Sequence, residues 1–506
     1  MPAIISRLSA MALLLSCSST VALAPLARAD ADLSYRDLVR QVANTSIVWV
    51  DPGASLIKGD TPVAQTAALF GKIVARYARP EEGIKAEAIE PTAIYETLGA
   101  FVLPVAPEDA QKALDQLPAI APEDARMLGT SIAVTSDMIV SLLDATDCSD
   151  KRAKELSQSG LKPNTMPVGV QRVRGGKAAS YKRKVWIVDT GLDNASQFIH
   201  VDANAAANCT LSNTTVGGPA AMCKASNAST FDQDLTDRIG HGTMLAGIIA
   251  ASGSAAGPSL VGVAPGATVV PVKIFGGTPD INLSGPPLAA LDYIARNAAT
   301  GDIVNLSWGA SWLEGMDQPQ NQLSTVWGPD GRRTGLIARL KKLIADKQLT
   351  IVTAAGNVDS VTRPSWVQFI MPAGAGSYPQ PNTGCRLCTV SAVESTLQSG
   401  KWTDKFWFDN NPPMPTGSPR YGSAYGRNPP DFAEPGVDVI SLWPRGATNA
   451  NRINTCSGTS FAAPHLAGIL VRGTVATDYN VTGDPDSPND KKTADPMGVL
   501  GKNTAE

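Results

Sequence analysis

The chain has 506 residues, of which 43% are apolar and 18% are charged, and its formal net charge is −3 at neutral pH. This balance is typical of a globular protein, and the length suffices for one large hydrophobic core plus an accessory region. The charge leaves no basic excess of the kind that binds nucleic acid, so nucleic acid is not an expected partner.

Residues 1–29 have the organisation of an export signal. Arg7 precedes the apolar run 8–23, and the small-x-small pattern at 27–29 offers a cleavage point just before Asp30. We therefore expect a secreted or periplasmic protein. An alternative is lipid anchoring at Cys17, because the residues before it loosely resemble a lipoprotein signal. No later apolar run is long enough to span a bilayer, so no transmembrane segment is expected in the mature chain.

Removal of this signal leaves an even number of cysteines, which in an exported chain favours disulfides. Their pairing stays open: Cys148, Cys209, Cys223, Cys385, Cys388 and Cys456. The Cys385-x-x-Cys388 pattern is compatible with a redox pair, half of a zinc site or a structural disulfide. With no second Cys-x-x-Cys and three histidines in the chain, a structural role is favoured.

Residues 30–164 are helix-leaning and carry no chemical signature. Segments 33–42 and 107–117 have apolar residues at helical spacing, and Pro107 with two following acids is typical of a helix start. We expect a separate N-terminal region here. At the other end, residues 481–506 are polar and are predicted to form a loose tail.

Between residues 165 and 480, predicted strands and helices alternate. The strands are expected at 185–188, 268–275, 302–308, 349–355, 389–393 and 437–442, and the helices at 242–251, 286–299, 335–347 and from 460. Continuous apolar strands separated by helices indicate an α/β fold, with a parallel sheet flanked by helices on both faces and right-handed crossovers.

Two candidate catalytic side chains follow from this pattern. Reactive groups in parallel sheets collect beyond the C-terminal ends of strands, and Asp189 directly follows the strand at 185–188. A turn or N-cap aspartate is the alternative. Of the three histidines, His241 starts a glycine-containing helix, His465 is expected to pack in a core, and His200 lies in no motif. His241 is therefore the candidate base.

Ser460 is the candidate nucleophile. Residues 454–468 read as a turn that breaks into a helix, which places the Ser460 hydroxyl near the positive end of the helix dipole. That position suits a nucleophile whose attack creates an oxyanion, although an N-cap serine is the commoner use. Asn357 ends the buried stretch 351–357, where it is either a turn residue or an amide donor.

Four motifs together resemble the subtilisin-like serine peptidases. They are Gly-Thr-Ser-Phe-Ala-Ala-Pro at 458–464, Gly-His-Gly-Thr at 240–243, Asp-Thr-Gly at 189–191 and Ala-Ala-Gly-Asn at 354–357. The chain order Asp, His, Ser is that of subtilisin. The resemblance spans about residues 166–472. It implies Ser460 as nucleophile, His241 as general base, Asp189 as its orienting acid, and the Asn357 amide as oxyanion donor.

The same resemblance implies where a substrate lies. Ser307, Trp308 and Gly309 correspond to a strand that pairs with an extended peptide, and Ala355 and Gly356 belong to the substrate-binding motif before Asn357. Trp308 is bulkier than the usual residue and narrows a subsite. No cofactor is expected, except that calcium is common in the family, and no acidic loop of this chain can be assigned to it.

The resemblance further implies that residues 30–164 form a prodomain that inhibits in cis until it is cleaved somewhere before Lys184. An uncleaved accessory domain is the alternative. The resulting prediction is an exported serine endopeptidase acting on proteins or peptides, with esterase activity as a by-product. The competing prediction is a catalytically weak protein of the same fold that binds a peptide or partner.

Overall fold

A computed structural model of the chain describes the segments that carry the predicted motifs. The described residues are 44–50, 62–78, 87–120, 123, 128, 132–136, 139–142, 148, 162–193, 198–210, 223–227, 229–230, 235–254, 259–276, 281–283, 285–309, 335–358, 372–373, 378–380, 384–407, 422–426, 430–444, 453–478, 481–483 and 497–501. The predicted helix at 33–42 and the export signal lie outside them.

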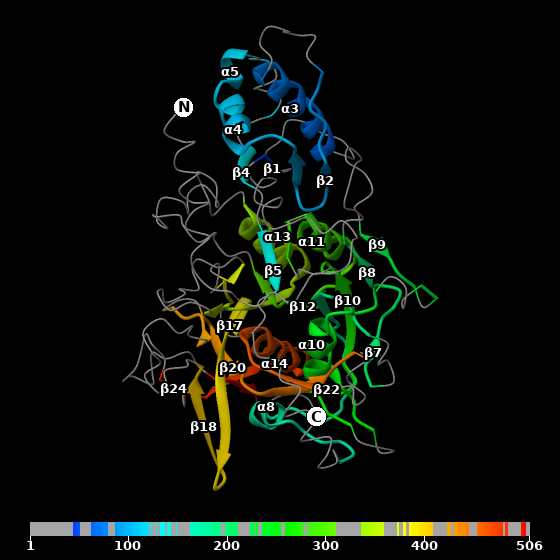
Figure 1. The fold of residues 1–506 in the computed structure, drawn as a ribbon, viewed down its shortest axis with the longest axis vertical. Helices are drawn as coiled ribbons and strands as arrows, with labels where there is room; N and C mark the ends of the chain where they lie inside the picture. The colour runs from blue at the N-terminus through cyan, green and yellow to red at the C-terminus, as the bar shows by residue number, and fades with distance from the viewer. Residues whose placement is uncertain are drawn as a thin grey trace, which may run out of the picture. The chain divides into compact units, whose positions relative to one another are not determined.

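A mostly parallel sheet forms the centre of the predicted α/β region (Figure 1). Its strand order is β23-β25-β20-β17-β14-β12-β6-β10-β8-β9. The bounds are β6 Val185–Asp189, β8 Ala207–Asn208, β9 Lys224–Ala225, β10 Thr268–Lys273, β12 Ile303–Leu306, β14 Thr350–Ala354, β17 Gly384–Gln398, β20 Phe432–Pro435, β23 Val475–Asp478 and β25 Met497–Leu500. From β10 through β25 along this order every pairing is parallel.

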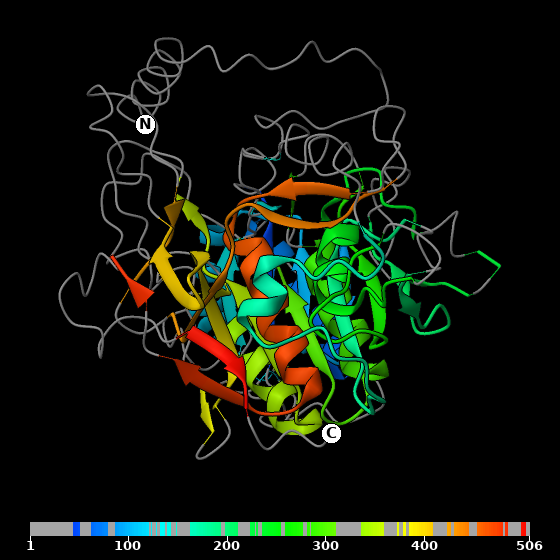
Figure 2. The same ribbon diagram turned by 90° about the horizontal axis from the view of Figure 1, so that it is seen from below.

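Helices cover both faces of this sheet, as predicted. In β6, Val185 and Ile187 join one hydrophobic cluster while Trp186 and Val188 join another, because successive strand residues point to opposite faces. Helices α10 (His241–Ala250) and α14 (Thr459–Arg472) pack in the first cluster, and α11 (Gly285–Asn297) and α13 (Leu336–Lys347) in the second. Figure 2 shows α14, in orange-red, lying along the strands.

Shorter elements complete the described part of the chain. They are α8 Val168–Arg172, β7 His200–Val201, β11 Ile281–Leu283, β13 Trp308–Gly309, β15 Asn357–Val358, β16 Tyr378–Gln380, β18 Lys401–Phe406, β19 Gly422–Ser423, β21 Val439–Leu442, β22 Ile453–Cys456 and β24 Val481–Thr482. β17 continues past the sheet and forms an antiparallel hairpin with β18.

The N-terminal region combines helices with a sheet, so its helix-leaning pattern gave only part of its structure. The helices are α3 Pro62–Ala78, α4 Pro107–Asp115 and α5 Leu117–Ile120. The strands β1 Ser46–Val50, β2 Ala93–Tyr95, β3 Ala100–Leu103 and β4 Ile132–Ser136 form an antiparallel sheet in the order β2-β3-β1-β4. Its inner face packs on α3 and α4, with Val48 and Val50 in that cluster.

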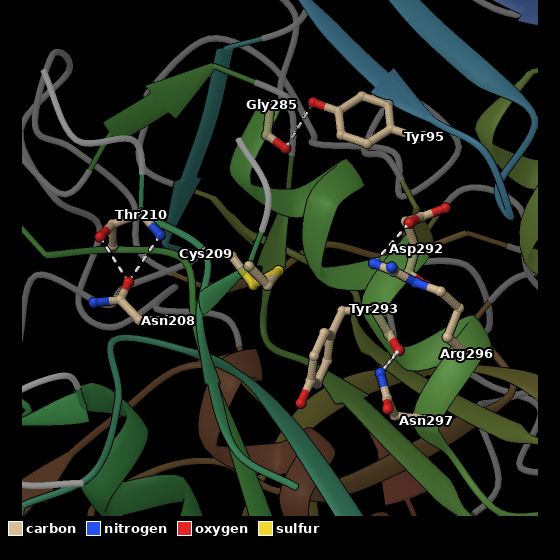
Figure 3. The surroundings of a disulfide bond; sticks show 10 residues. Tyr95, Asn208, Cys209, Thr210, Gly285, Asp292, Tyr293, Arg296 and Asn297 are labelled. Carbon is tan, nitrogen blue, oxygen red and sulfur yellow. Dashed lines mark hydrogen bonds and ion pairs between the residues drawn. A yellow bond between two sulfur atoms is a disulfide. The ribbon is translucent and has the colours of Figure 1, made fainter. Parts of the chain in front are cut away.

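The other face of this small sheet packs against the helices of the large one. Ile47 and Trp49 share a hydrophobic cluster with residues of α11 and α13, again because strand residues alternate. Asp292 of α11 accepts hydrogen bonds from the backbone N–H groups of Thr97 and Leu98 at 2.9 and 2.8 Å. The Tyr95 hydroxyl donates to the Gly285 carbonyl at 3.1 Å, as Figure 3 shows. Apolar and polar contacts therefore both fix this junction.

Three disulfides use all six cysteines that were predicted to pair: Cys148–Cys456, Cys209–Cys223 and Cys385–Cys388. Cys209 lies beside α11 in Figure 3. Cys385 and Cys388 pair with each other within β17, as either a structural disulfide or a redox pair would, so their structural role stays a prediction.

Two predicted features differ from the structure. The strand expected at 437–442 is β21, and it pairs antiparallel with β22 outside the parallel sheet. The polar tail contains β25, which enters the main sheet because Met497 and Val499 are apolar and fully buried. Composition averaged over the tail hid this short apolar run.

Candidate active site

Asp189 is the last residue of β6, at the C-terminal edge of the parallel sheet, where the sequence pattern placed it. Its side chain has no exposed surface. Oδ1 accepts a hydrogen bond from the backbone N–H of Thr190 at 2.8 Å. A buried carboxylate of this kind is costly unless further donors satisfy it.

His241 supplies that donor. Its Nδ1 lies 2.8 Å from Oδ1 and 2.9 Å from Oδ2 of Asp189. Because an ionised carboxylate only accepts, Nδ1 carries the proton, and the neutral tautomer then has its lone pair on Nε2. The pair therefore orients the imidazole and prepares Nε2 to accept a proton.

Gly242 permits this close approach of α10 to the end of β6. A Cβ on Gly242 would lie 2.3 Å from the Gly191 carbonyl oxygen and 3.3 Å from Asp189 Oδ1. The Gly242 N–H instead donates to Thr190 Oγ1 at 2.8 Å. The glycine after the histidine is thus required by the space beside the Asp–His pair.

Asp237 holds the backbone on both sides of His241. Its Oδ1 accepts from the N–H groups of Ile239 and Gly240 at 3.0 and 2.7 Å. Its Oδ2 accepts from the N–H and hydroxyl of Thr243 at 2.9 and 2.7 Å. Asp237 was not among the predicted site residues, although an aspartate shortly before a helix start is a common N-terminal capping signal.

Ser460 lies in the first turn of α14 and is completely buried. Pro464 has no N–H, so it cannot donate to the carbonyl of Ser460 as an ordinary helical residue would. The hydroxyl of Ser307 takes that place and donates to the Ser460 carbonyl at 3.0 Å, while Asn305 Nδ2 donates to Ser307 Oγ at 2.9 Å. The Ser460 hydroxyl in turn donates to the Ser307 carbonyl at 3.3 Å.

Asn357 lies beside this helix start. Its Oδ1 accepts hydrogen bonds from the N–H and the hydroxyl of Thr459, both at 2.9 Å. Because the N–H of Thr459 can only donate, the amide atom that faces α14 is the oxygen. The NH₂ group of Asn357 is therefore on the opposite side of the amide. The Asn357 amide therefore lies beside the helix turn that contains the candidate nucleophile, and its role as an oxyanion donor stays a prediction.

The predicted catalytic residues thus fall into two groups that meet at one helix contact. Asp189 and His241 form one group, and Ser460 and Asn357 are joined through Thr459. Phe461, the residue after Ser460, has its ring centroid 5.3 Å from that of His241. The contact brings the start of α10 to the start of α14.

The predicted substrate strand is β13, which contains Trp308 and Gly309. Two backbone groups expected near it are already engaged: the Ala355 N–H donates to the Val390 carbonyl, and the Gly356 N–H donates to Thr459 Oγ1 at 3.1 Å. Trp308 is buried, with 1% of its surface exposed. Gly356 therefore supports the start of α14, whereas Ala355 is bonded to Val390 of β17.

A segment from the N-terminal region lies on this strand. β5 (Ile139–Leu142) is the central strand of an antiparallel sheet with the order β11-β5-β13. Leu142 is paired with Trp308 and Ser141 with Gly309. No sequence pattern predicts this pairing, because it joins residues far apart in the chain.

The other two histidines lie outside this group. His465 is buried, its Nδ1 lies 2.9 Å from the Phe461 carbonyl, and burial lowers its pKa to about 4. It is a packed core histidine, as predicted. His200 is exposed in β7.

Within the described residues, no group of three or more His, Cys, Asp or Glu side chains could hold a metal ion. Calcium therefore remains an expectation from resemblance and enters no step below. Nor is any helix in the described parts long and apolar enough to cross a membrane.

Comparisons with known proteins show which family the chain resembles. A family model described as the subtilase family matches residues 181–482. Subtilisin-like protease 2 of Pseudogymnoascus destructans is 29% identical over 235 residues, which are 46% of this chain and 42% of that protein. Subtilisin-like serine protease Pen ch 13 of Penicillium rubens is 27% identical over 47% of this chain and 44% of its own length.

The chain thus spans less than half the length of these curated relatives. Among solved structures, fervidolysin from Fervidobacterium pennivorans, titled a keratinolytic enzyme related to subtilisin, matches with a TM-score of 0.45 and 15% identity over 85% of this chain and 54% of its own. A TM-score this low supports no argument about function.

Proposed function

Because this chain belongs to the subtilase family, we propose that it is an exported serine endopeptidase that hydrolyses peptide bonds through an acyl-enzyme on Ser460. The observation that carries the proposal is the buried hydrogen-bonded pair of Asp189 and His241, held beside α14, whose first turn contains Ser460. Export rests on the signal-like residues 1–29.

In the first half of the reaction, the Ser460 hydroxyl turns from the Ser307 carbonyl toward His241. Nε2 accepts its proton as Oγ attacks the substrate carbonyl. Asp189 keeps the imidazole in the required tautomer and stabilises the imidazolium that forms. Nε2 then returns the proton to the leaving amine, which departs and leaves an ester on Ser460.

Deacylation repeats these steps with water. His241 accepts a proton from water as the water oxygen attacks the ester carbonyl, and returns it to Ser460 Oγ when the acid product leaves. In both halves negative charge develops on the carbonyl oxygen. The Asn357 amide and the Ser460 backbone N–H are the proposed donors to it, and the bonds from Thr459 hold that amide in place.

We propose that substrates are extended peptides that pair with β13, with Trp308 narrowing the site beside them. The support is the position of β5, which forms backbone pairs with both β13 and β11. A strand added between two strands of a protein is a known mode of peptide binding. The N-terminal region would therefore inhibit in cis, since β5 occupies the position beside β13 where a substrate would pair.

The test compares the wild-type chain with Ser460→Ala. The wild-type chain should convert itself to a shorter form on a reducing gel, hydrolyse casein and react with a fluorophosphonate. Ser460→Ala should stay at its initial length and do neither. If a folded wild-type protein, with its N-terminal region removed by an added protease, hydrolyses nothing and stays unlabelled, the chain is instead the peptide-binding protein of the same fold.

A further inference from the structure

The Cys148–Cys456 disulfide joins two segments that are separated by 308 residues, whereas the other two disulfides span separations of 14 and 3. Cys209–Cys223 and Cys385–Cys388 therefore stabilise local structure. Cys148–Cys456 instead attaches the end of the N-terminal region to the peptidase region. Neither the catalytic mechanism nor local stability accounts for its position.

Cys456 is close to the nucleophile in the chain. It is the last residue of β22, which leads through three residues into Ser460 and α14. Cys148 forms an antiparallel backbone bridge with Cys456 in addition to the disulfide. Cys148 of the N-terminal region is thus fixed directly beside β22, the strand before Ser460.

The N-terminal region is attached at a second point, through β5. Leu142 at the end of β5 pairs with Trp308, and the neighbouring Ser307 carbonyl accepts the Ser460 hydroxyl. Leu142 and Cys148 are six positions apart in the sequence, so the disulfide tethers β5 to the peptidase region through a short linker. One attachment is a reversible strand pair, and the other is covalent.

We propose that Cys148 is a thiol–disulfide exchange site whose oxidised state keeps β5 paired with β13 at the candidate substrate strand, and that a dithiol reductant allows β5 to leave. The proposal rests on the proposed peptidase function. A peptide-bond cut alone leaves the part that contains Cys148 attached beside Ser460. Covalent attachment through a short linker keeps β5 at a local concentration of about millimolar near β13, so that β5 competes with an incoming peptide.

The accessibility of the two sulfurs favours exchange at Cys148. Cys148 is exposed, whereas Cys456 is completely buried. A thiolate of the reductant attacks Sγ of Cys148, which breaks the S–S bond and releases Cys456 as a thiolate that takes up a proton. The second thiol of the reductant then attacks the mixed disulfide, is oxidised with the first to a disulfide, and leaves Cys148 as a thiol.

The test measures hydrolysis of an internally quenched peptide that extends on both sides of the cut bond. The oxidised wild-type protein is compared with the same protein after dithiothreitol and with Cys148→Ser/Cys456→Ala. We expect reduction and the double variant each to raise the rate of peptide hydrolysis by about tenfold or more, because β5 is no longer tethered by the disulfide. The matched control Cys209→Ser/Cys223→Ser should keep the response to dithiothreitol.

Equal rates in the oxidised, reduced and double-variant proteins would overturn the exchange site while leaving the peptidase proposal intact, provided that a fluorophosphonate labels all three. Absence of labelling in all three folded proteins would instead overturn the peptidase proposal. If the double variant does not fold, the response of the wild type and of Cys209→Ser/Cys223→Ser to dithiothreitol decides the question.

Discussion

The molecule contains two completely different uses of a buried histidine. His241 is the first residue of α10, and His465 lies within the adjacent helix α14. The exposed fraction is 2% for His241 and 1% for His465. Each places Nδ1 within hydrogen-bond distance of an oxygen. For His241 that oxygen belongs to the carboxylate of Asp189, and for His465 to the backbone carbonyl of Phe461.

The partner decides what each imidazole can do. A carboxylate stabilises the protonated ring, so His241 can accept a proton during a reaction. A backbone carbonyl offers much less, and burial lowers the pKa of His465 to about 4. His465 is therefore neutral near neutral pH. Burial alone marks neither residue as catalytic.

The largest effect expected from this comparison separates the two histidines. His241→Gln should lower kcat by about 10⁵–10⁶, close to the loss known for subtilisin itself when its catalytic histidine is removed. His465→Gln should change kcat less than about tenfold while lowering Tm, because it disturbs only packing and one bond to a backbone carbonyl. Steady-state kinetics and thermal melts of both variants measure these outcomes. Similar losses of kcat would show that the partner argument is wrong.

The next effect concerns the amide beside the nucleophile. Asn357→Ala should lower kcat by about 10²–10³, the cost of losing this type of donor in subtilisin, with a small change in KM. Asn454→Ala is the matched control, because its buried amide oxygen accepts from the neighbouring Thr455 N–H. Equal kcat values for the two variants would argue against Asn357 as an oxyanion donor.

A smaller effect is expected at the residue that positions His241. Asp237→Asn keeps one acceptor oxygen but loses an acceptor toward Thr243, so the histidine shifts and kcat should fall by about tenfold at constant KM. Asp202→Asn, which also removes a carboxylate that accepts from two backbone N–H groups, should leave kcat unchanged. An equal decrease in both variants would indicate a general loss of stability.

The smallest effect concerns a buried acid in β20. Burial raises the pKa of Glu434 well above its usual value of 4.5, so the folded state binds its proton more tightly than the unfolded chain. The contribution of this proton to the free energy of unfolding is fully present below the unfolded pKa. It declines as pH rises toward the folded pKa, by up to about 1.4 kcal/mol per pH unit.

Glu434→Gln should remove this decline. Urea unfolding of both forms between pH 5 and 8, in a Ser460→Ala background that prevents self-digestion, should show the wild-type acid losing stability relative to glutamine as pH rises. Parallel pH curves would show that Glu434 does not titrate differently in the folded state.

The sequence was sufficient for features that depend on short stretches of chain. The apolar run before Asp189, the glycines around His241 and the turn before Ser460 each specify their own local structure, and the parallel sheet follows from their order. The N-terminal strands escape prediction because helical segments dominate the pattern of 30–164, and β25 does so because its short apolar run lies in a polar tail.

Contacts between distant residues could not be predicted in the same way. The disulfide pairing of Cys148 with Cys456 and the pairing of β5 with β13 depend on how the two regions fold together. The same holds for the hydroxyl of Ser307, which binds the Ser460 carbonyl only because Pro464 leaves it without a helical donor. Sequence identifies such residues individually but not their partners.

The central claim is that Asp189 and His241 activate Ser460. Its most direct test is the intact mass and peptide map of the protein after reaction with a fluorophosphonate, with the N-terminal region removed and the disulfides reduced by dithiothreitol. The account predicts a single adduct on Ser460 in the wild type and none in folded His241→Gln. An adduct on another residue, or equal labelling of Ser460 in both proteins, would contradict it.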